Sequence, residues 1–186
     1  MKTFQYVALG TAGNLVRGEQ TADSQEDLQA RLARLDASTD GEYAQDVANG
    51  IRASMQKHAG VFRTQASMDA GVVKVAAIAE RVKAIGLKDK SKVFNTARVE
   101  ALEVENLIEA AQATIESAAA RHECRGAHTV KDYERGADDA EFPLGRNDRE
   151  WMKHSLWYSE GSRLDYKPVK MQPLTVDTVP PKVRTF

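Results

Sequence analysis

The stretch TARVEALEVENLIEAAQATIESAAARH, residues 96–122, contains the longest helical pattern in the chain. Its apolar residues recur every three or four positions, as they do on one face of an α-helix. Glu100, Glu103 and Glu109 lie largely off that face. A single apolar face on so long a helix is typical of packing inside an antiparallel helical bundle. The residues of this face are Val104, Leu107, Ile108, Ala111, Ile115 and Ala118.

Three shorter helical patterns precede this one. Asp23 and Glu26 are suited to cap the first helix, and Ser67 to cap the third. The third pattern stops at Gly86, as expected of a C-terminal glycine cap. We therefore predict a mainly α fold, an antiparallel three- to four-helix bundle over residues 23–123. The three apolar faces are Leu28, Leu32 and Leu35; Tyr43, Val47, Ile51 and Met55; and Val72, Val75, Ile78, Val82 and Ile85.

The segments on either side of the bundle are less regular. In residues 1–22, FQYVAL and LVRGEQTA flank the turn-forming GTAGN, which predicts a β-hairpin or a start that is foreign to the rest of the chain. Residues 124–186 predict a long, irregular, partly β tail, because glycine, proline and charged residues dominate its first part. Two extended runs around a Gly-Ser turn predict a hairpin within this tail, and two prolines exclude a helix at its end.

The composition is that of an ordinary globular protein, with 42% hydrophobic and 28% charged residues. Because 26 Lys and Arg residues face 27 Asp and Glu residues, the chain carries no electrostatic footprint for nucleic acid. No run approaches the roughly 18 apolar residues that a membrane-spanning helix needs. A single cysteine, Cys124, excludes an internal disulfide and fits a reducing cytosol.

The segment HECRGAHTVKDY, residues 122–133, contains several side chains of types that can bind a metal ion or take part in catalysis. Zinc sites usually draw on two separated ligand pairs, and this segment has no distant second pair. Arg125 would lower the pKa of a nucleophilic thiol at Cys124, yet no residue for an oxyanion hole can be named. A dinucleotide motif G-x-G-x-x-G is absent from the sequence, so we predict no catalytic, cofactor-binding or metal-ligating residue. The metal-ligating types weighed are His122, Cys124, His128 and Asp132.

Several motifs resemble the C-terminal helical region of the succinate dehydrogenase and fumarate reductase flavoprotein subunit. FNTARVEALE, then RGAH, an aspartate-rich loop and WMKHSL follow in the order and spacing of that family, and the ending PPKVRTF is similar to its terminus. GEYAQDVANGIRASMQKHAGVFRTQ, residues 41–65, extends the match upstream, so the resemblance covers Arg31 to Phe186. The acidic loop ADDAEFPLGRNDREW is longer than the family's short form, which indicates a bacterial lineage.

The resemblance implies a parent enzyme that oxidises succinate to fumarate on covalently held FAD and passes electrons to an iron-sulfur subunit. The family's flavin and substrate residues lie upstream of the matched region, so we expect this chain alone to be inactive and to hold no cofactor. The implied partners are the flavin-binding part of the flavoprotein and the iron-sulfur subunit, with no nucleic acid and no direct membrane insertion. The implied location is cytoplasmic, at the inner face of the membrane within a complex.

Within this resemblance, RGAH is expected to be the structural junction where the last helix meets the tail. Gly126 permits a backbone turn, and Arg125 and His128 are expected to hold the junction by hydrogen bonds, either to the tail or to the flavin domain. The many aromatic residues of the tail favour an interface. The expected function is a non-catalytic C-terminal module that braces the flavin domain and helps form the surface met by the iron-sulfur subunit; the alternative is a freestanding helical interaction protein without enzymatic activity. The candidate interface residues are Trp151, Trp157, Tyr158 and Tyr166.

The start of the chain carries a second resemblance. FQYVALGTAGNLVRGEQTADSQEDLQARLARL, residues 4–35, resembles the N-terminal start of inner-membrane platform proteins of type II secretion and pilus assembly. That pattern is a strand pair followed by a short helix. Two explanations are open: an unrelated start joined to the flavoprotein-like remainder, or a chance similarity.

Overall fold

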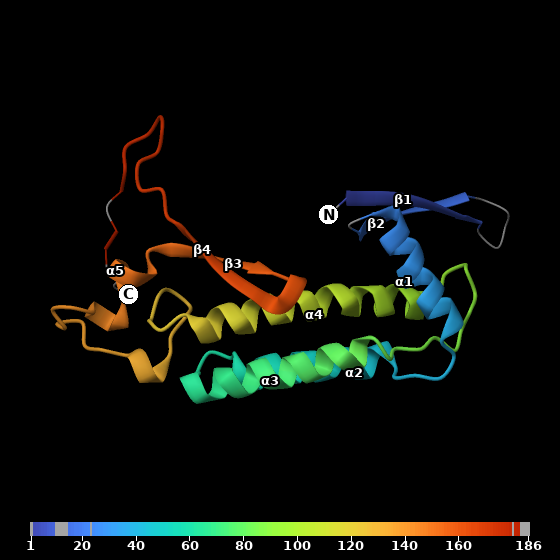
Figure 1. Cartoon of the computed structure of the whole chain (residues 1–186), viewed down its shortest axis with the longest axis horizontal. Helices are drawn as coiled ribbons and strands as arrows, with labels where there is room; N and C mark the ends of the chain where they lie inside the picture. The colour runs from blue at the N-terminus through green and yellow to red at the C-terminus, as the bar shows by residue number, and fades with distance from the viewer. Residues whose placement is uncertain (1, 10–14, 23, 180, 183–186) are drawn as a thin grey trace. The chain divides into compact units, whose positions relative to one another are not determined.

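The computed structural model describes residues 2–9, 15–22, 24–179 and 181–182. Long helices dominate it, which confirms the predicted mainly α fold with a partly β tail (Figure 1). These helices are α1, Gln25–Ala37; α2, Ala44–His58; α3, Gln65–Val82; and α4, Thr96–Ala120. The shorter elements are β1, Lys2–Leu9; β2, Leu15–Ala22; η1, Lys131–Tyr133; η2, Pro143–Gly145; α5, Asp148–Trp151; β3, Lys153–Tyr158; η3, Glu160–Ser162; and β4, Arg163–Pro168.

The chain divides into two compact units. The first comprises Met1–Ile51 and Ala77–Ile108, and the second comprises Arg52–Ala76 and Glu109–Phe186. The domain bounds predicted from the sequence stay predictions. The buried apolar residues of the first unit are Leu28, Leu35, Ala44, Val47, Ala48, Ile51, Ile78, Val82, Ile85, Leu87, Ala101, Leu102, Val104 and Ile108. Those of the second unit are Met68, Val75, Ala111, Ile115, Ala119, Cys124, Val130 and Trp151.

Two predictions near helix starts are wrong. Ser24 is the N-cap of α1, because its Oγ accepts the backbone N–H of Asp27 at 3.1 Å. The predicted pair of Asp23 and Glu26 is therefore displaced by one residue, and Asp23 itself lies outside the described residues. Tyr43 was assigned to the apolar face of α2, yet it precedes the helix and 54% of its surface is exposed. A residue just before a helix does not share the direction of the face that follows it.

Both predicted ends of α3 are also corrected. Thr64 Oγ1 accepts the backbone N–H of Ser67 at 3.1 Å, so Thr64 supplies the cap and Ser67 lies inside the helix. The helix ends at Val82, before Gly86, and Gly86 has no left-handed φ. A Cβ atom at Gly86 would lie 3.0 Å from the backbone nitrogen of Gly41, so glycine is required there by the close approach of two backbone segments.

Within the first unit, β1 and β2 pair antiparallel, in a register that runs from Lys2 opposite Ala22 to Leu9 opposite Leu15. Helix α1 follows directly and is joined to α4 by ion pairs. Arg34 and Arg31 both reach the carboxylate of Glu105, Arg31 at 3.5 Å. Burial raises the pKa of the Glu105 carboxyl, and the two arginines oppose that shift.

Candidate functional site at the end of helix α4

The residues RGAH, 125–128, form a tight turn shortly after α4, within the second unit. Arg125 donates its backbone N–H to the carbonyl of His128 at 2.8 Å, and His128 donates its own to the carbonyl of Arg125 at 3.0 Å. Gly126 has a φ of 58°, a left-handed conformation that favours glycine at the first central position of such a turn. The chain therefore reverses its direction immediately after the helix.

The carboxylate of Glu123 lies beside this turn and is fully buried. Its Oε1 accepts hydrogen bonds from Arg121 and Arg125, both at 2.7 Å. Its Oε2 accepts from Arg125 at 3.0 Å and from the backbone N–H of Asn147 at 2.9 Å. A buried carboxylate is tolerated only when it is paired and hydrogen-bonded in this way. We call this set of contacts the Glu123 network; it joins the end of α4 to the start of α5.

The two arginines of the Glu123 network also hold other parts of the tail. Arg121 donates to the backbone carbonyls of Trp151 at 3.0 Å and Lys153 at 2.7 Å. Arg125 donates to the carboxylate of Asp148 at 2.7 Å. These hydrogen bonds fix α5 and the start of β3 against the end of α4.

Trp151 belongs to the core of the second unit, since only 5% of its surface is exposed. Its ring lies 6.2 Å from that of His122 and 5.8 Å from that of Tyr166, and the Nζ atom of Lys153 lies 4.4 Å from its centre. Its buried indole N–H has no acceptor among the described residues. The apolar surface of this candidate interface residue is therefore used largely within the chain.

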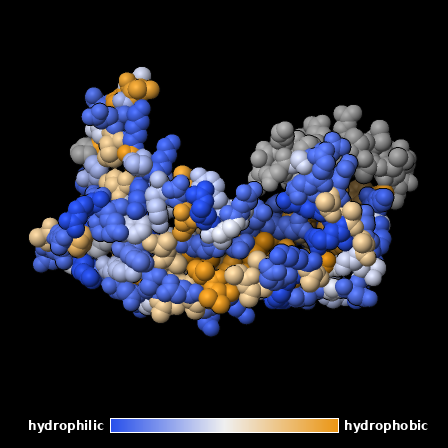
Figure 2. All heavy atoms as spheres, viewed as in Figure 1, coloured by the Kyte–Doolittle hydropathy of each residue, from blue (hydrophilic) through white to orange (hydrophobic). Residues whose placement is uncertain are grey.

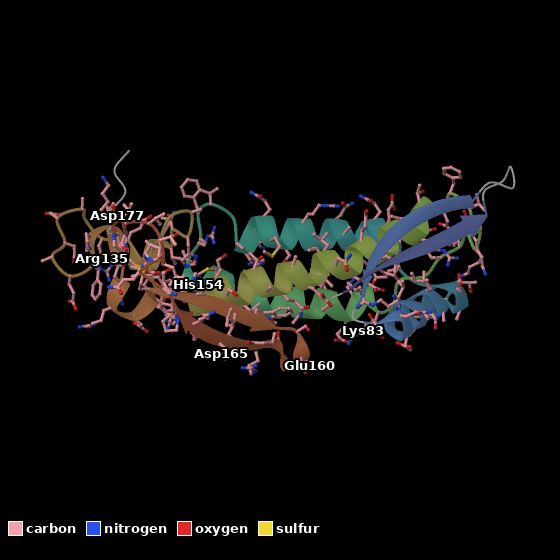
Figure 3. All side chains as sticks on the ribbon, turned by 90° about the horizontal axis from the view of Figure 1, so that it is seen from above. Lys83, Arg135, His154, Glu160, Asp165 and Asp177 are labelled. Atoms are coloured by element: carbon pink, nitrogen blue, oxygen red, sulfur yellow. The ribbon has the colours of Figure 1, made fainter. Side chains whose placement is uncertain are left out.

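The other candidate interface residues lie on the hairpin of β3 and β4, whose strands pair antiparallel. The indole N–H of Trp157 donates to Glu116 on α4 at 2.6 Å, and the hydroxyl of Ser162 donates to the same carboxylate at 2.6 Å. Trp157 and Tyr166 are half-buried, whereas Tyr158 is 41% exposed. The hairpin is thus attached by one side to α4. The exposed side chains labelled on it in Figure 3 are His154, Glu160 and Asp165.

The residues considered from the sequence as metal ligands, and set aside there, form hydrogen bonds with separate partners. Cys124 donates its S–H to the carbonyl of Val130 at 3.3 Å, and Asp132 accepts the backbone N–H of Gln65 at 2.7 Å. Burial raises the pKa of the Cys124 thiol, so the lowered pKa considered from the sequence is wrong. Within the residues that the structure describes, no three His, Cys, Asp or Glu side chains are grouped to hold a metal ion.

Sequence reasoning missed two residues that organise this region. Gln65, the first residue of α3, donates its side-chain amide to the carbonyl of Ala119 at 2.9 Å and accepts from the Tyr133 hydroxyl at 3.0 Å. Glu123 was passed over as one charged residue among many. Its only local signal is an arginine two positions away on each side, at Arg121 and Arg125, and that spacing has no meaning on a helix.

His128 is half-buried, and its Nε2–H donates to the carbonyl of Arg121 at 2.9 Å. Burial is the main influence on the imidazole and lowers its pKa, while the hydrogen bond to the carbonyl opposes that shift. The charges of Arg63 and Arg121 lower the pKa further, and that of Glu123 raises it. The folded protein therefore favours neutral His128.

We expect the protein to lose stability as the pH falls through about 6.5, the ordinary pKa of histidine in an unfolded chain. The unfolded chain takes up a proton there more readily than the folded one, so the stabilisation from neutral His128 is present above that pH and is lost on acidification. Melting temperatures between about pH 7.5 and 5.5 test this. His128→Gln keeps a hydrogen-bond donor but does not titrate; an equally steep pH dependence in this variant would contradict the assignment.

A surface depression of about 360 Å³ lies beside η2 and α5 in the second unit. Its lining includes Phe142, Arg146, Asp148 and Lys182, and no Cys, His, Ser or Thr. Arg146 is paired with Asp148 at 2.6 Å, so part of its charge is already neutralised. The groups with acid–base chemistry in its lining are thus carboxylates and the amine of Lys182. Among the described helices, none combines the length and the hydropathy that crossing a membrane requires.

Two protein families match the chain. The family described as fumarate reductase flavoprotein C-term matches residues 48–186. The family described as type II secretion system protein F, N-terminal domain, matches residues 1–36. The two matches do not overlap, so the ends of the chain are similar to different families.

Individual relatives agree with the longer match. The succinate dehydrogenase flavoprotein subunit of Coxiella burnetii is 37% identical over 155 residues, which cover 83% of this chain and 24% of the relative. The fumarate reductase flavoprotein subunit of Haemophilus influenzae is 34% identical over 157 residues, or 82% of this chain and 24% of the relative. A solved structure of E. coli quinol fumarate reductase FrdA has a TM-score of 0.66 and 28% identity, covering 91% of this chain and 28% of that one. The chain therefore spans about a quarter of the length of these proteins.

Proposed function

Because the chain belongs to the C-terminal family of fumarate reductase and succinate dehydrogenase flavoproteins, we propose that it is the helical docking module of such a flavoprotein. Its role is to brace the flavin-binding part of the subunit and to help form the surface met by an iron-sulfur subunit. The oxidation of succinate, or the reduction of fumarate, belongs to the rest of the subunit, since this chain spans only about a quarter of it.

The Glu123 network is the observation that supports a positional role. Its buried carboxylate is satisfied entirely from within the chain, by Arg121, Arg125 and the backbone of Asn147. Groups that take part in catalysis need a free face toward a substrate. Here the arginines hold α5 and the start of β3 against the end of α4, which suits a module that presents a fixed surface to a partner.

The flavin that the family name implies does not fit the described residues. Dinucleotide sites are built on parallel strands with a glycine-rich turn into a helix. The strands that the structure describes form two separate antiparallel pairs, β1 with β2 and β3 with β4. Flavin binding is therefore assigned to the upstream part of the family subunit.

We expect the purified chain to be colourless and inactive by itself, and to bind the upstream part of a family subunit. The upstream part of the Coxiella burnetii subunit, ending where its match to this chain begins and purified with its flavin absorbance, is a suitable probe. Adding the chain should raise succinate-dependent dye reduction by this probe. Dye reduction by the chain alone would contradict the proposal, because it would show that the chain is itself an enzyme. Failure to bind a probe that retains flavin would also contradict it and would favour a freestanding interaction protein.

The family match over residues 1–36 supports a second proposal, that this start is an interaction module of separate origin. It has the order β1, β2 and α1, with the capping Ser24 directly before the helix. Deleting residues 1–22 leaves that cap in place. We expect the deletion to change the affinity for the upstream flavoprotein probe by less than about twofold. A loss of binding of tenfold or more would show that the start serves the same docking function.

A further inference from the structure

Residues 169–179 form a loop of the second unit, and residues 181–182 follow it (Figure 1); both segments are attached to the rest of that unit by a hydrogen bond. At its start, the backbone N–H of Val169 donates to the carbonyl of Met152 at 3.3 Å. After it, Arg146 donates to the carbonyl of Lys182 at 2.9 Å. Between them, the hydroxyl of Thr178 donates to the carbonyl of Met171 at 2.9 Å and closes the loop on itself. The middle of the loop therefore projects from the second unit between two attachment points.

The presented part of this loop is apolar and exposed. Leu174 is 89% exposed, Val176 69% and Val179 82%. Figure 2 shows hydrophobic residues at the tip of this loop, far from its two attachment points. Among the described residues, no backbone-to-backbone hydrogen bond engages residues 170–179. Neighbouring aliphatic side chains that are exposed together are characteristic of a surface that a partner covers.

We propose that the apolar loop, residues 169–179, docks onto an apolar surface of the part of a family subunit that lies upstream of the matched region. This inference rests on the proposed function and specifies where the docking takes place. The matched region is 24% to 28% of the length of its relatives, so about three-quarters of a family subunit is available to cover this loop. The two attachments restrict the conformations of the loop before it binds, which reduces the conformational entropy lost on binding.

The composition of the loop favours a protein surface over a lipid one. Asp177, labelled in Figure 3, lies between Val176 and Val179, so inserting the apolar side chains into lipid would also bury a carboxylate. Residues 169–182 include no Trp, Tyr or Phe, the residues that anchor proteins at a membrane interface. A protein partner can instead offer a hydrogen-bond donor to the Asp177 carboxylate beside the apolar contact.

The test compares two double variants for binding to the flavin-retaining upstream probe from Coxiella burnetii. Leu174→Ser with Val176→Ser removes the apolar end of the loop. Val61→Ser with Val73→Ser is the matched control, because those valines are 73% and 71% exposed in the same unit but lie outside the loop. We expect the loop variant to bind at least about tenfold more weakly than the wild-type chain, and the control to bind within about twofold of it. Hydrogen exchange of residues 170–179 should slow on binding only when the loop is intact.

The alternative outcomes are distinct. If the wild-type chain does not bind a probe that retains flavin, the proposed function fails and this inference fails with it. If the loop variant binds as tightly as the wild type, or if the control loses as much affinity, only the loop inference is overturned. Sedimentation of the wild-type chain with phosphatidylserine vesicles, abolished in the loop variant, would identify a membrane as the occupant and overturn the protein partner. Concentration-dependent dimerisation that only the loop variant loses would identify a second copy and overturn it equally.

Discussion

Glu123→Ala should lower the free energy of unfolding by about 3–5 kcal/mol, the range for removing one partner from a buried ion pair. The Glu123 carboxylate is fully buried and accepts hydrogen bonds from Arg121, Arg125 and the backbone N–H of Asn147. In the variant, each of the two guanidinium groups loses one of its acceptors and the amide of Asn147 loses its acceptor; Arg121, which is only 15% exposed, has little access to water in exchange. Chemical denaturation of the full chain measures the loss.

A glutamate outside the network provides the comparison. Glu134 is exposed, and Glu134→Ala should change the free energy of unfolding by less than about 0.5 kcal/mol. Glu123→Gln preserves the size of the side chain but replaces one acceptor oxygen with a donor that faces other donors, so we expect it to be destabilising as well. Equal losses in Glu123→Ala and Glu134→Ala would show that the buried carboxylate does not hold the junction.

Ile115→Ala is expected to cost about 2–5 kcal/mol of unfolding free energy, through lost apolar burial and the cavity left behind. Ile115 on α4 is 0% exposed. Its Cδ1 and Cγ1 atoms lie 3.0 and 3.2 Å from the position that a Cβ atom on Gly71 would occupy, so α3 and α4 pack closely there. Tight packing limits how far the neighbours can relax into the cavity, which places the expected loss toward the upper part of the range.

The control for this prediction lies on the same helix. Glu103 is exposed on α4, and Glu103→Ala should alter the free energy of unfolding by less than about 0.5 kcal/mol, since alanine also favours the helix. Ile108→Ala, at a residue that is 5% exposed in the first unit, should fall in the same range as Ile115→Ala. Denaturation curves that do not separate the isoleucine variants from Glu103→Ala would show that the buried face of α4 is wrongly assigned.

The helices and their buried faces were predictable because helix geometry is local. An apolar residue every three or four positions can lie on one side of a helix whatever the rest of the chain does, and Val104, Ile108 and Ile115 are indeed buried. The helix ends were less predictable. Gly86 follows the helical pattern as a C-terminal cap would, but α3 ends at Val82, and Gly86 instead lies where the backbone approaches Gly41.

The candidate site was harder to predict from the sequence than the helix ends. The sequence indicated a turn at RGAH and an aromatic-rich tail, but not which of its side chains would be buried. Trp151 is of a residue type common at interfaces, yet it lies in the core. Leu174 is of a type common in cores, yet it is 89% exposed. Glu123, whose charge is typical of a surface residue, is buried. Neighbours distant in sequence decide each of these outcomes.

The sequence by itself thus determined the helical character of the chain, the apolar faces of its long helices and, through its motifs in order, its family. These are properties of local spacing and of residue identity, which need no knowledge of what lies nearby in space. Only the tertiary structure decided that Glu123 is satisfied by Arg121, Arg125 and the distant Asn147, and that the loop of residues 169–179 presents its aliphatic side chains to solvent. The physical reason is that burial and the pairing of charges depend on long-range packing, and sequence spacing does not encode which distant segment arrives beside a given residue.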